Sequence, residues 1–346
     1  MSTSGLPAVP ERVREELAGL SPAAALALAA MVGLLALGAA VEPRLFVEQA
    51  IGGLVYGMIL VLIALGLALI LGLMGVVNFA HGALFMLGAY FSYHVVVALG
   101  LPFWAALVLA PVGVGLVGVA MEMTVLRRLY GGEPIVSLLA TFGLTLMVED
   151  AIRATWGAAP LGYDIPGPLA TSTDLGVTSV GTFRLTIVVV SAVAVGAVYL
   201  LITRTDFGLS VRAGVQDGEM AEFVGVNLPV RFTAMFFLGA AIAGFAGVLR
   251  AAEFGMGTSM GETFVILAFV VVVVGGVGSL FGSVISGLLI GEATFLTPVV
   301  LSALADVTGV PWIDVDAVGG LMPYVVMIVV LLYRPRGLFG EEGFLE

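Results

Sequence analysis

The stretch GVVNFAHGALFMLGAY, residues 75–90, places an amide and an imidazole inside one of the most apolar parts of this chain. No Asp, Glu, Lys or Arg occurs between Glu48 and Glu122. Asn78 and His81 therefore need hydrogen-bond partners where charge is scarce, because burying such a group without a partner costs about 1–3 kcal/mol. Glycines flank the pair, and glycine lets a backbone leave the helical path. The stretch predicts a broken helix inside a membrane.

The composition of the whole chain supports a membrane location. Of its 346 residues, 60% are hydrophobic and 11% are charged, against about 25% charged in a soluble domain. Apolar runs of about 18 residues or more recur along the chain, and such runs are typical of transmembrane helices. They lack the short alternating pattern of a transmembrane barrel. We expect an all-α integral membrane protein, a polytopic helical bundle.

Several kinds of chemistry are disfavoured by the residue counts. The chain has no Cys, so disulfides and thiol chemistry are excluded, and His81 and His94 are its only two His, which argues against a metal site. All 13 basic residues are Arg, against 24 acidic residues, and the net charge is −11. Nucleic-acid binding favours basic patches, so we expect no nucleic-acid partner.

The apolar runs predict ten membrane-spanning segments, or eight if two glycine-interrupted segments re-enter the membrane on the same side. The segments are 21–41, 49–73, 76–99, 102–121, 134–154, 184–203, 231–251, 263–281, 282–301 and 319–333. Residues 21–41 alternatively resemble a signal peptide, since LGAAV supplies small residues. The doubtful regions are 75–82 and 263–305.

Arginine placement sets the expected orientation. With the N-terminus inside, nine Arg fall on the cytoplasmic side and four outside, as the positive-inside rule requires. This predicts a cytoplasmic acidic tail at 1–20, a transmembrane domain at 21–340 and a cytoplasmic tail at 341–346, with both termini in the cytoplasm. The longest polar segment on that side is the loop 204–231.

Two glycine-rich breaks suggest a faint internal duplication. GLMGVVNFAHG (72–82) and GGVGSLFGS (275–283) each interrupt a long apolar run, and duplicated halves with broken helices are a recurring transporter design. A break frees backbone groups that lipid cannot satisfy, which favours a wet substrate path near Asn78 and His81. Alternatively, Asn78 caps the helix that follows, and His81 bonds a neighbouring carbonyl.

The remaining membrane charges have plainer interpretations. Glu149 and Arg153 are four residues apart, so we expect them to pair on one helix face near the outer interface. We expect the other acidic residues near the spans, Glu122 and Glu292, to lie at helix ends. His94 is expected to pack near the outer face.

In the cytoplasmic loop, DGEMAEFVGVN (217–227) predicts a short amphipathic helix. Asp217 is a good N-cap, and Gly225 suits the helix stop. Met220, Phe223 and Val224 form an apolar stripe on one face. Because an acidic helix suits an anionic membrane surface poorly, the stripe is expected to contact the bundle itself or to dock on a partner protein.

Several blocks together resemble the permease subunits of branched-chain amino acid ABC transporters. They are GLVYGMILVLIALGLALILGLMGVVNFAHGALFMLGAY (53–90), TFGLTL (141–146), VVVGGVGSLFGSVISGLLIGE (272–292) and the terminal YRPRGLFG. The loop GLSVRAGVQDGEMAEFVGVN resembles the family's coupling segment, through Arg212, Ala213, Asp217, Ala221, Gly225 and Val226. The likeness extends over about residues 48–340.

The resemblance implies an all-α permease that is not an enzyme and works beside other chains. These are a second permease subunit, two cytoplasmic ABC ATPase subunits that bind ATP and magnesium, and an external substrate-binding protein. It implies that this chain binds no cofactor itself. It places Asn78, His81 and Gly82 near the translocation path, with Gly275, Gly276, Gly278 and Ser279 as their counterpart. It assigns ATPase coupling to the segment with Arg212, Asp217, Glu219, Ala221, Phe223 and Gly225.

Three alternatives remain at this stage. A urea or short-chain amide permease shares the same sequence blocks. A stand-alone secondary carrier or channel would need acidic residues in the middle of the bundle. A membrane-embedded enzyme would need metal ligands or a nucleophile–base pair, for which the chain offers no pattern.

Overall fold

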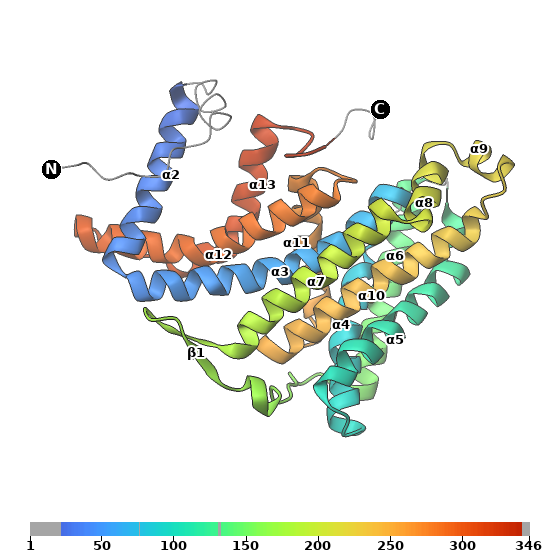
Figure 1. Cartoon of the computed structure of the whole chain (residues 1–346), viewed down its shortest axis with the longest axis horizontal. Helices are drawn as coiled ribbons and strands as arrows, with labels where there is room; N and C mark the ends of the chain where they lie inside the picture. The colour runs from blue at the N-terminus through green and yellow to red at the C-terminus, as the bar shows by residue number, and fades with distance from the viewer. Residues whose placement is uncertain (1–21, 76, 131–132, 341–346) are drawn as a thin grey trace.

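The computed structural model describes residues 22–340 except positions 76, 131 and 132, and it is a helical bundle with one two-stranded sheet (Figure 1). Its helices are α2 Pro22–Val41, α3 Pro43–Met74, α4 Ala80–Tyr93, α5 Phe103–Thr124, α6 Pro134–Trp156, α7 Thr182–Arg204, α8 Asp206–Gln216, α9 Gly218–Phe223, α10 Leu228–Phe254, α11 Met260–Gly275, α12 Leu280–Thr308 and α13 Met322–Tyr333. The predicted tails, 1–20 and 341–346, lie outside the described residues.

The helices agree with the prediction of a polytopic helical membrane protein. Within the described ranges, eight helical segments are long and apolar enough to cross a membrane. The part Met31–Val41 of α2 and the helix Met260–Gly275 are shorter apolar segments. The chain is therefore a multi-pass membrane protein within the predicted range of eight to ten spans. The last segment differs from expectation, because residues 316–321 form a 3-10 turn and α13 begins only at Met322.

Helix α3 forms the centre of the bundle. Its membrane-spanning window is 83% buried, whereas that of Pro311–Tyr333 is only 12% buried. Helices α7, α10, α11 and α12 all pack on α3. A Cβ added at Gly57 of α3 would lie 3.1 Å from the Gly287 carbonyl of α12. Small residues thus let these two helices approach closely, which is how transmembrane helices gain packing energy without a hydrophobic driving force.

The two ends of the bundle carry different connections. At one end the loop 157–181 contains strands β1 Ser172–Asp174 and β2 Ser179–Gly181, which pair antiparallel. At the other end, α8 and α9 connect α7 to α10 (Figure 1). Helix α7 separates the ends by about 35 Å for its 23 residues. The composition of residues 157–183 gave no indication of a hairpin, because each strand is only three residues long.

Candidate functional site

The two predicted breaks exist, and they touch each other. Helix α3 ends at Gly75, whose φ of +65° is left-handed, and α4 begins at Ala80. Between α11 and α12, Gly276 and Gly278 have φ values of +99° and +85°. A Cβ added at Gly72 would lie 2.6 Å from the Gly278 Cα. The structure therefore packs the end of α3, which leads into the first break, against the second break.

The packing around the breaks pairs like with like. The long helix α3 packs on the long helix α12, and the shorter α4 packs on the shorter α11. The order of long and short helix is thus reversed between the halves. The predicted duplication stays a prediction, but the arrangement joins the two breaks at one place in the bundle.

Asn78 and His81 are both completely buried beside the first break. The His81 Nε2 lies 2.9 Å from the Ile63 carbonyl oxygen, so the expected bond to a neighbouring carbonyl is present. The His81 Nδ1 and both amide atoms of Asn78 have no hydrogen-bond partner among the described residues. An unsatisfied buried amide costs about 1–3 kcal/mol. Such a group is available to a polar ligand if the break opens.

Helix capping does not explain Asn78. The residue before α4 is Phe79, which is already helical at φ −69°, and no side chain caps this helix. The Phe79 N–H instead donates to the Thr141 Oγ1 of α6, 3.1 Å away. The alternative that Asn78 caps the following helix is therefore wrong, because the Asn78 Oδ1 accepts no backbone N–H among the described residues.

The other predicted path residues pack closely against neighbouring backbone. A Cβ at Gly82 would collide with the Gly261 carbonyl of α11, and one at Gly275 would lie 2.5 Å from the Gly282 carbonyl carbon. The Ser279 hydroxyl accepts the Gly282 N–H at 3.0 Å and caps α12. These positions let helices approach closely in this conformation, and their role in transport stays a prediction.

The cytoplasmic loop forms the expected amphipathic helix. The Asp217 carboxylate accepts the Met220 N–H at 2.9 Å, which caps α9, and Gly225 follows the helix with a φ of +89°. Phe223 and Val224 are 84% and 73% exposed. The apolar stripe therefore does not pack on the bundle.

Not all of the predicted coupling residues point outward. Glu219 is exposed, but Ala221 is buried against the chain itself. The Arg212 side chain donates to the Ile202 carbonyl oxygen at the end of α7. These two residues hold the loop in place, although Arg212 is exposed like Asp217, Glu219, Phe223 and Gly225, so Ala221 is the buried member of the set.

A buried ionic cluster, which the sequence did not indicate, anchors the same end of the bundle. The fully buried Glu122 carboxylate accepts Arg127 at 2.9 and 3.1 Å, Tyr130 at 3.0 Å and Thr233 at 2.9 Å. Burial and this carboxylate raise the pKa of Tyr130, so its hydroxyl stays a donor. Thr233 is on α10, far along the chain, and local spacing could not reveal the contact.

Of the remaining charges, one differs from expectation. Arg153 pairs with Glu149 as predicted, and His94 packs against the Trp156 ring with centroids 6.2 Å apart. Glu122 lies near the end of α5. Glu292, however, lies near the middle of α12, and its Oε2 is buried with no hydrogen-bond partner in the described part of the chain. The expectation of a helix end was wrong, because Glu292 is more than ten residues from either end of α12.

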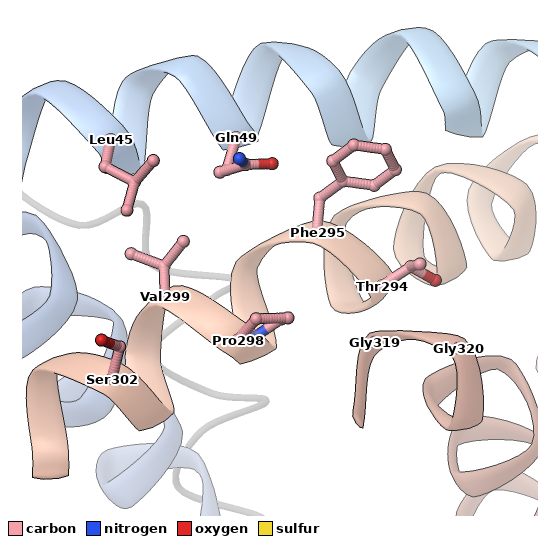
Figure 2. A pocket seen from close by; sticks show the side chains of 9 residues that line it. All are labelled: Leu45, Gln49, Thr294, Phe295, Pro298, Val299, Ser302, Gly319 and Gly320. Carbon is pink, nitrogen blue, oxygen red and sulfur yellow. The ribbon is translucent and has the colours of Figure 1, made fainter. Parts of the chain in front are cut away.

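Three cavities among the described residues are lined by none of the seven predicted path residues. Figure 2 shows one of about 350 Å³, where Gln49 of α3 faces Phe295 and Val299 of α12. A second lies beside Tyr163 in the hairpin loop. The third, of about 360 Å³, contains Arg250.

Comparison with known proteins extends over most of the chain. Residues 49–331 match a family model described as "Branched-chain amino acid transport system / permease component". The chain is 29% identical to the high-affinity branched-chain amino acid transport system permease protein BraD of Pseudomonas aeruginosa, over 86% of this chain and 96% of the relative. It is 28% identical to the LivH permease protein of Escherichia coli K12 over the same shares.

An archaeal relative is similar as well. The chain is 27% identical to a probable branched-chain amino acid transport permease protein LivH of Methanocaldococcus jannaschii, over 84% of this chain and 91% of the relative. No solved structure matches the chain.

Proposed function

Because this chain belongs to the family of branched-chain amino acid transport system permease components, we propose that it is the membrane subunit of an ATP-driven importer for leucine, isoleucine and valine. The observation that carries the proposal is the family match, which extends from the start of the bundle core to α13. The relatives reported above are named for branched-chain amino acids, which favours these solutes over urea and short-chain amides.

The energy source is proposed to be a separate polypeptide. A phosphate-binding P-loop requires a Lys, and the chain contains none. ATP and magnesium would then be bound by two ATPase subunits that contact this chain through α9. The exposed Phe223 and Val224 favour such a contact, because aromatic side chains that enter a partner's groove often dominate binding energy.

The same contact would set the orientation. An ATPase on α9 places the α8–α9 end in the cytoplasm, and the β1–β2 hairpin then faces outward, where an external substrate-binding protein would deliver the amino acid. A second permease subunit would cover part of the exposed apolar surface. This orientation agrees with the excess of Arg on the cytoplasmic side.

In the proposed mechanism the bundle alternates between two states. Closure of the ATPase pair would move α9, and α8 and the Glu122 cluster would transmit that movement to α7 and α10. The meeting breaks then supply a place where helices can separate, with Asn78 and His81 exposed to the passing solute. ATP binding drives the switch only if the ATPases bind the two states with different affinity.

Glu292 is relevant to the alternative function, a stand-alone secondary carrier or channel. A mid-span acidic residue is the feature expected of an ion-coupled secondary carrier, so sequence position no longer argues against that class. The family match favours the ABC permease instead. A complex that imports leucine only with hydrolysable ATP would decide between them.

Replacing Phe223 with Asp tests the proposal most directly. We expect the variant to lose the co-purified ATPase subunits and ATP-dependent leucine uptake in proteoliposomes, because a charge replaces an 84% exposed aromatic anchor. Glu222→Ala, next to it on α9, is the matched control and should retain both. An ATPase that stays bound to Phe223→Asp at the wild-type level would contradict docking through α9.

A further inference from the structure

Arg250 is a membrane-depth cation that lacks a carboxylate partner. It lies in α10, four residues before the helix ends at Phe254, and it is partly buried. Its Nη1 donates to the Gly255 carbonyl at 3.1 Å, and its Nε is buried with no acceptor. The nearby Glu253 is already paired with Arg184 at 2.6 Å. Among the described residues, no carboxylate lies within ion-pair distance of Arg250.

Aromatic rings hold the guanidinium in position. The Arg250 Cζ lies 4.5 Å from the Phe254 ring centre and 5.5 Å from that of Phe264. A cation over an aromatic face is attracted to it, and the attraction grows when water is excluded. The rings thus stabilise the guanidinium without neutralising its charge.

The guanidinium lines a cavity of about 360 Å³. Met256, Met260 and Phe264 give this cavity an apolar wall, and Thr263 also lines it. The hairpin loop closes one side, because Leu161 and Met256 exchange backbone hydrogen bonds of 3.0 and 2.9 Å. A cavity of roughly 300 Å³ or more with an apolar wall and one oriented charge is typical of a small-molecule site.

A branched-chain amino acid matches this cavity in both charge and shape. An unpaired charge in a low-dielectric site costs free energy. A carboxylate that pairs with the planar guanidinium recovers much of that free energy. Methionine and phenylalanine side chains suit a branched apolar tail, since Met adapts to irregular shapes. The cavity lies at the hairpin end, and the part of α11 from Phe264 to Gly275 separates it from the second break by about 17 Å.

We propose that Arg250 binds the carboxylate of the amino acid in a reception site at the outer mouth of the permease, before the amino acid reaches the breaks. The assignment rests on the proposed function. It gives the chain two stations: Arg250 with its apolar wall at the hairpin end, and Asn78 with His81 beside the breaks.

The test measures solute binding by the purified complex of this chain with its permease and ATPase partners, without the binding protein. Leucine and 4-methylvalerate, which both have a carboxylate, should raise the melting temperature at about 10 mM, a concentration that detects weak sites. Leucinamide, which lacks the carboxylate, should not. Arg250→Gln should weaken leucine binding by about tenfold or more, the usual size of a lost charged hydrogen bond.

Two further variants guard the interpretation. Arg153→Gln removes another arginine at the same end and should leave leucine binding unchanged. Thr263→Trp fills the cavity while leaving Arg250 in place and should also weaken binding, which covers the case that Arg250→Gln does not fold. Equal binding of leucine and leucinamide by the wild type, or unchanged leucine binding in a folded Arg250 or Thr263 variant, would overturn the proposal.

ATP-dependent uptake by the complete system distinguishes failure of the reception site from failure of the proposed importer function. If the wild-type complex with its binding protein imports leucine but Arg250 variants bind it normally, only the reception site is wrong. If Arg250→Gln reduces association of the binding protein and leaves solute binding intact, Arg250 recognises a protein carboxylate and the proposal is again overturned. If the wild type imports no leucine, the proposed function and the reception site both fail.

Discussion

The first break, Gly75–Phe79, and the second, Gly276–Ser279, use the same backbone device but satisfy their polar groups differently. At the second break Ser279 caps α12, and the Val274 and Gly275 carbonyls accept N–H groups from Leu338 and Phe339 at 2.8 and 3.0 Å. At the first break both amide atoms of Asn78 lack a partner. The polar groups of the second break are thus satisfied by hydrogen bonds, whereas the first break contains side-chain polar atoms without a partner.

This difference indicates that one break has a structural role and the other a role in transport. Backbone groups freed inside a membrane must be satisfied by protein or by a wet cavity. The C-terminal segment that contains YRPRGLFG does this for the second break. We infer that the first break is the one whose polar groups are completed by water or solute when the bundle opens.

The largest expected effect comes from separating the two breaks. In Gly72→Ala the added methyl group would meet the Gly278 backbone at 2.6 Å, and backbone cannot move aside cheaply. We expect a loss of about 3 kcal/mol of stability, the upper range for overpacking, measured by thermal unfolding of the purified complex. Both breaks should be affected together.

The control for this substitution is Gly143→Ala in α6, where nothing lies within 4 Å of the added atom. Alanine there should be neutral or stabilising by up to about 1 kcal/mol, because it is the better helix former. Equal melting temperatures for the two variants would mean that the breaks do not touch in the protein as it exists in the membrane.

The second prediction tests whether the unpartnered amide of Asn78 serves the solute. Asn78→Leu has nearly the same size and removes two unsatisfied groups, so we expect a gain of about 2 kcal/mol in stability. Leucine uptake should nevertheless fall, since the amide would no longer be available to the solute. Thermal unfolding and ATP-dependent uptake are measured on the same preparation.

Asn227 provides the matched comparison, because its side chain accepts the Val230 N–H at 3.2 Å and caps α10. Asn227→Leu should lower stability by about 1 kcal/mol. If Asn78→Leu also lowers stability and leaves uptake unchanged, Asn78 has a structural partner and the first break is as complete as the second.

The sequence predicted the elements that depend on local patterns. The predicted segments 134–154 and 184–203 correspond to Pro134–Trp156 and Thr182–Arg204, because long apolar runs bounded by polar residues define a helix in lipid. The cap at Asp217 and the stop at Gly225 were also predictable, since both depend on neighbours within a few residues.

The missed features depend on contacts between distant segments. The Glu122 cluster needs Thr233, and the Arg250 cavity needs Leu161 of the hairpin loop beside Met256. For Asn78, residue preference favoured a cap, but the Asn78 Oδ1 accepts no N–H among the described residues. Periodicity and residue preference carry no information about such packing, so only part of the candidate site could be found from the sequence.

The smallest effect is expected at the second break, whose polar groups already have hydrogen-bond partners. Ser279→Ala removes the hydroxyl that accepts the Gly282 N–H, and losing such a cap costs about 1 kcal/mol. Uptake by the folded protein should stay near the wild-type level, because Ser279 acts on α12 and the sealing bonds from Leu338 and Phe339 remain. Melting temperature and uptake are compared with those of Asn78→Leu. If Ser279→Ala instead abolishes uptake while its melting temperature falls only slightly, the hydroxyl contacts the solute, and the two breaks contribute alike to the path.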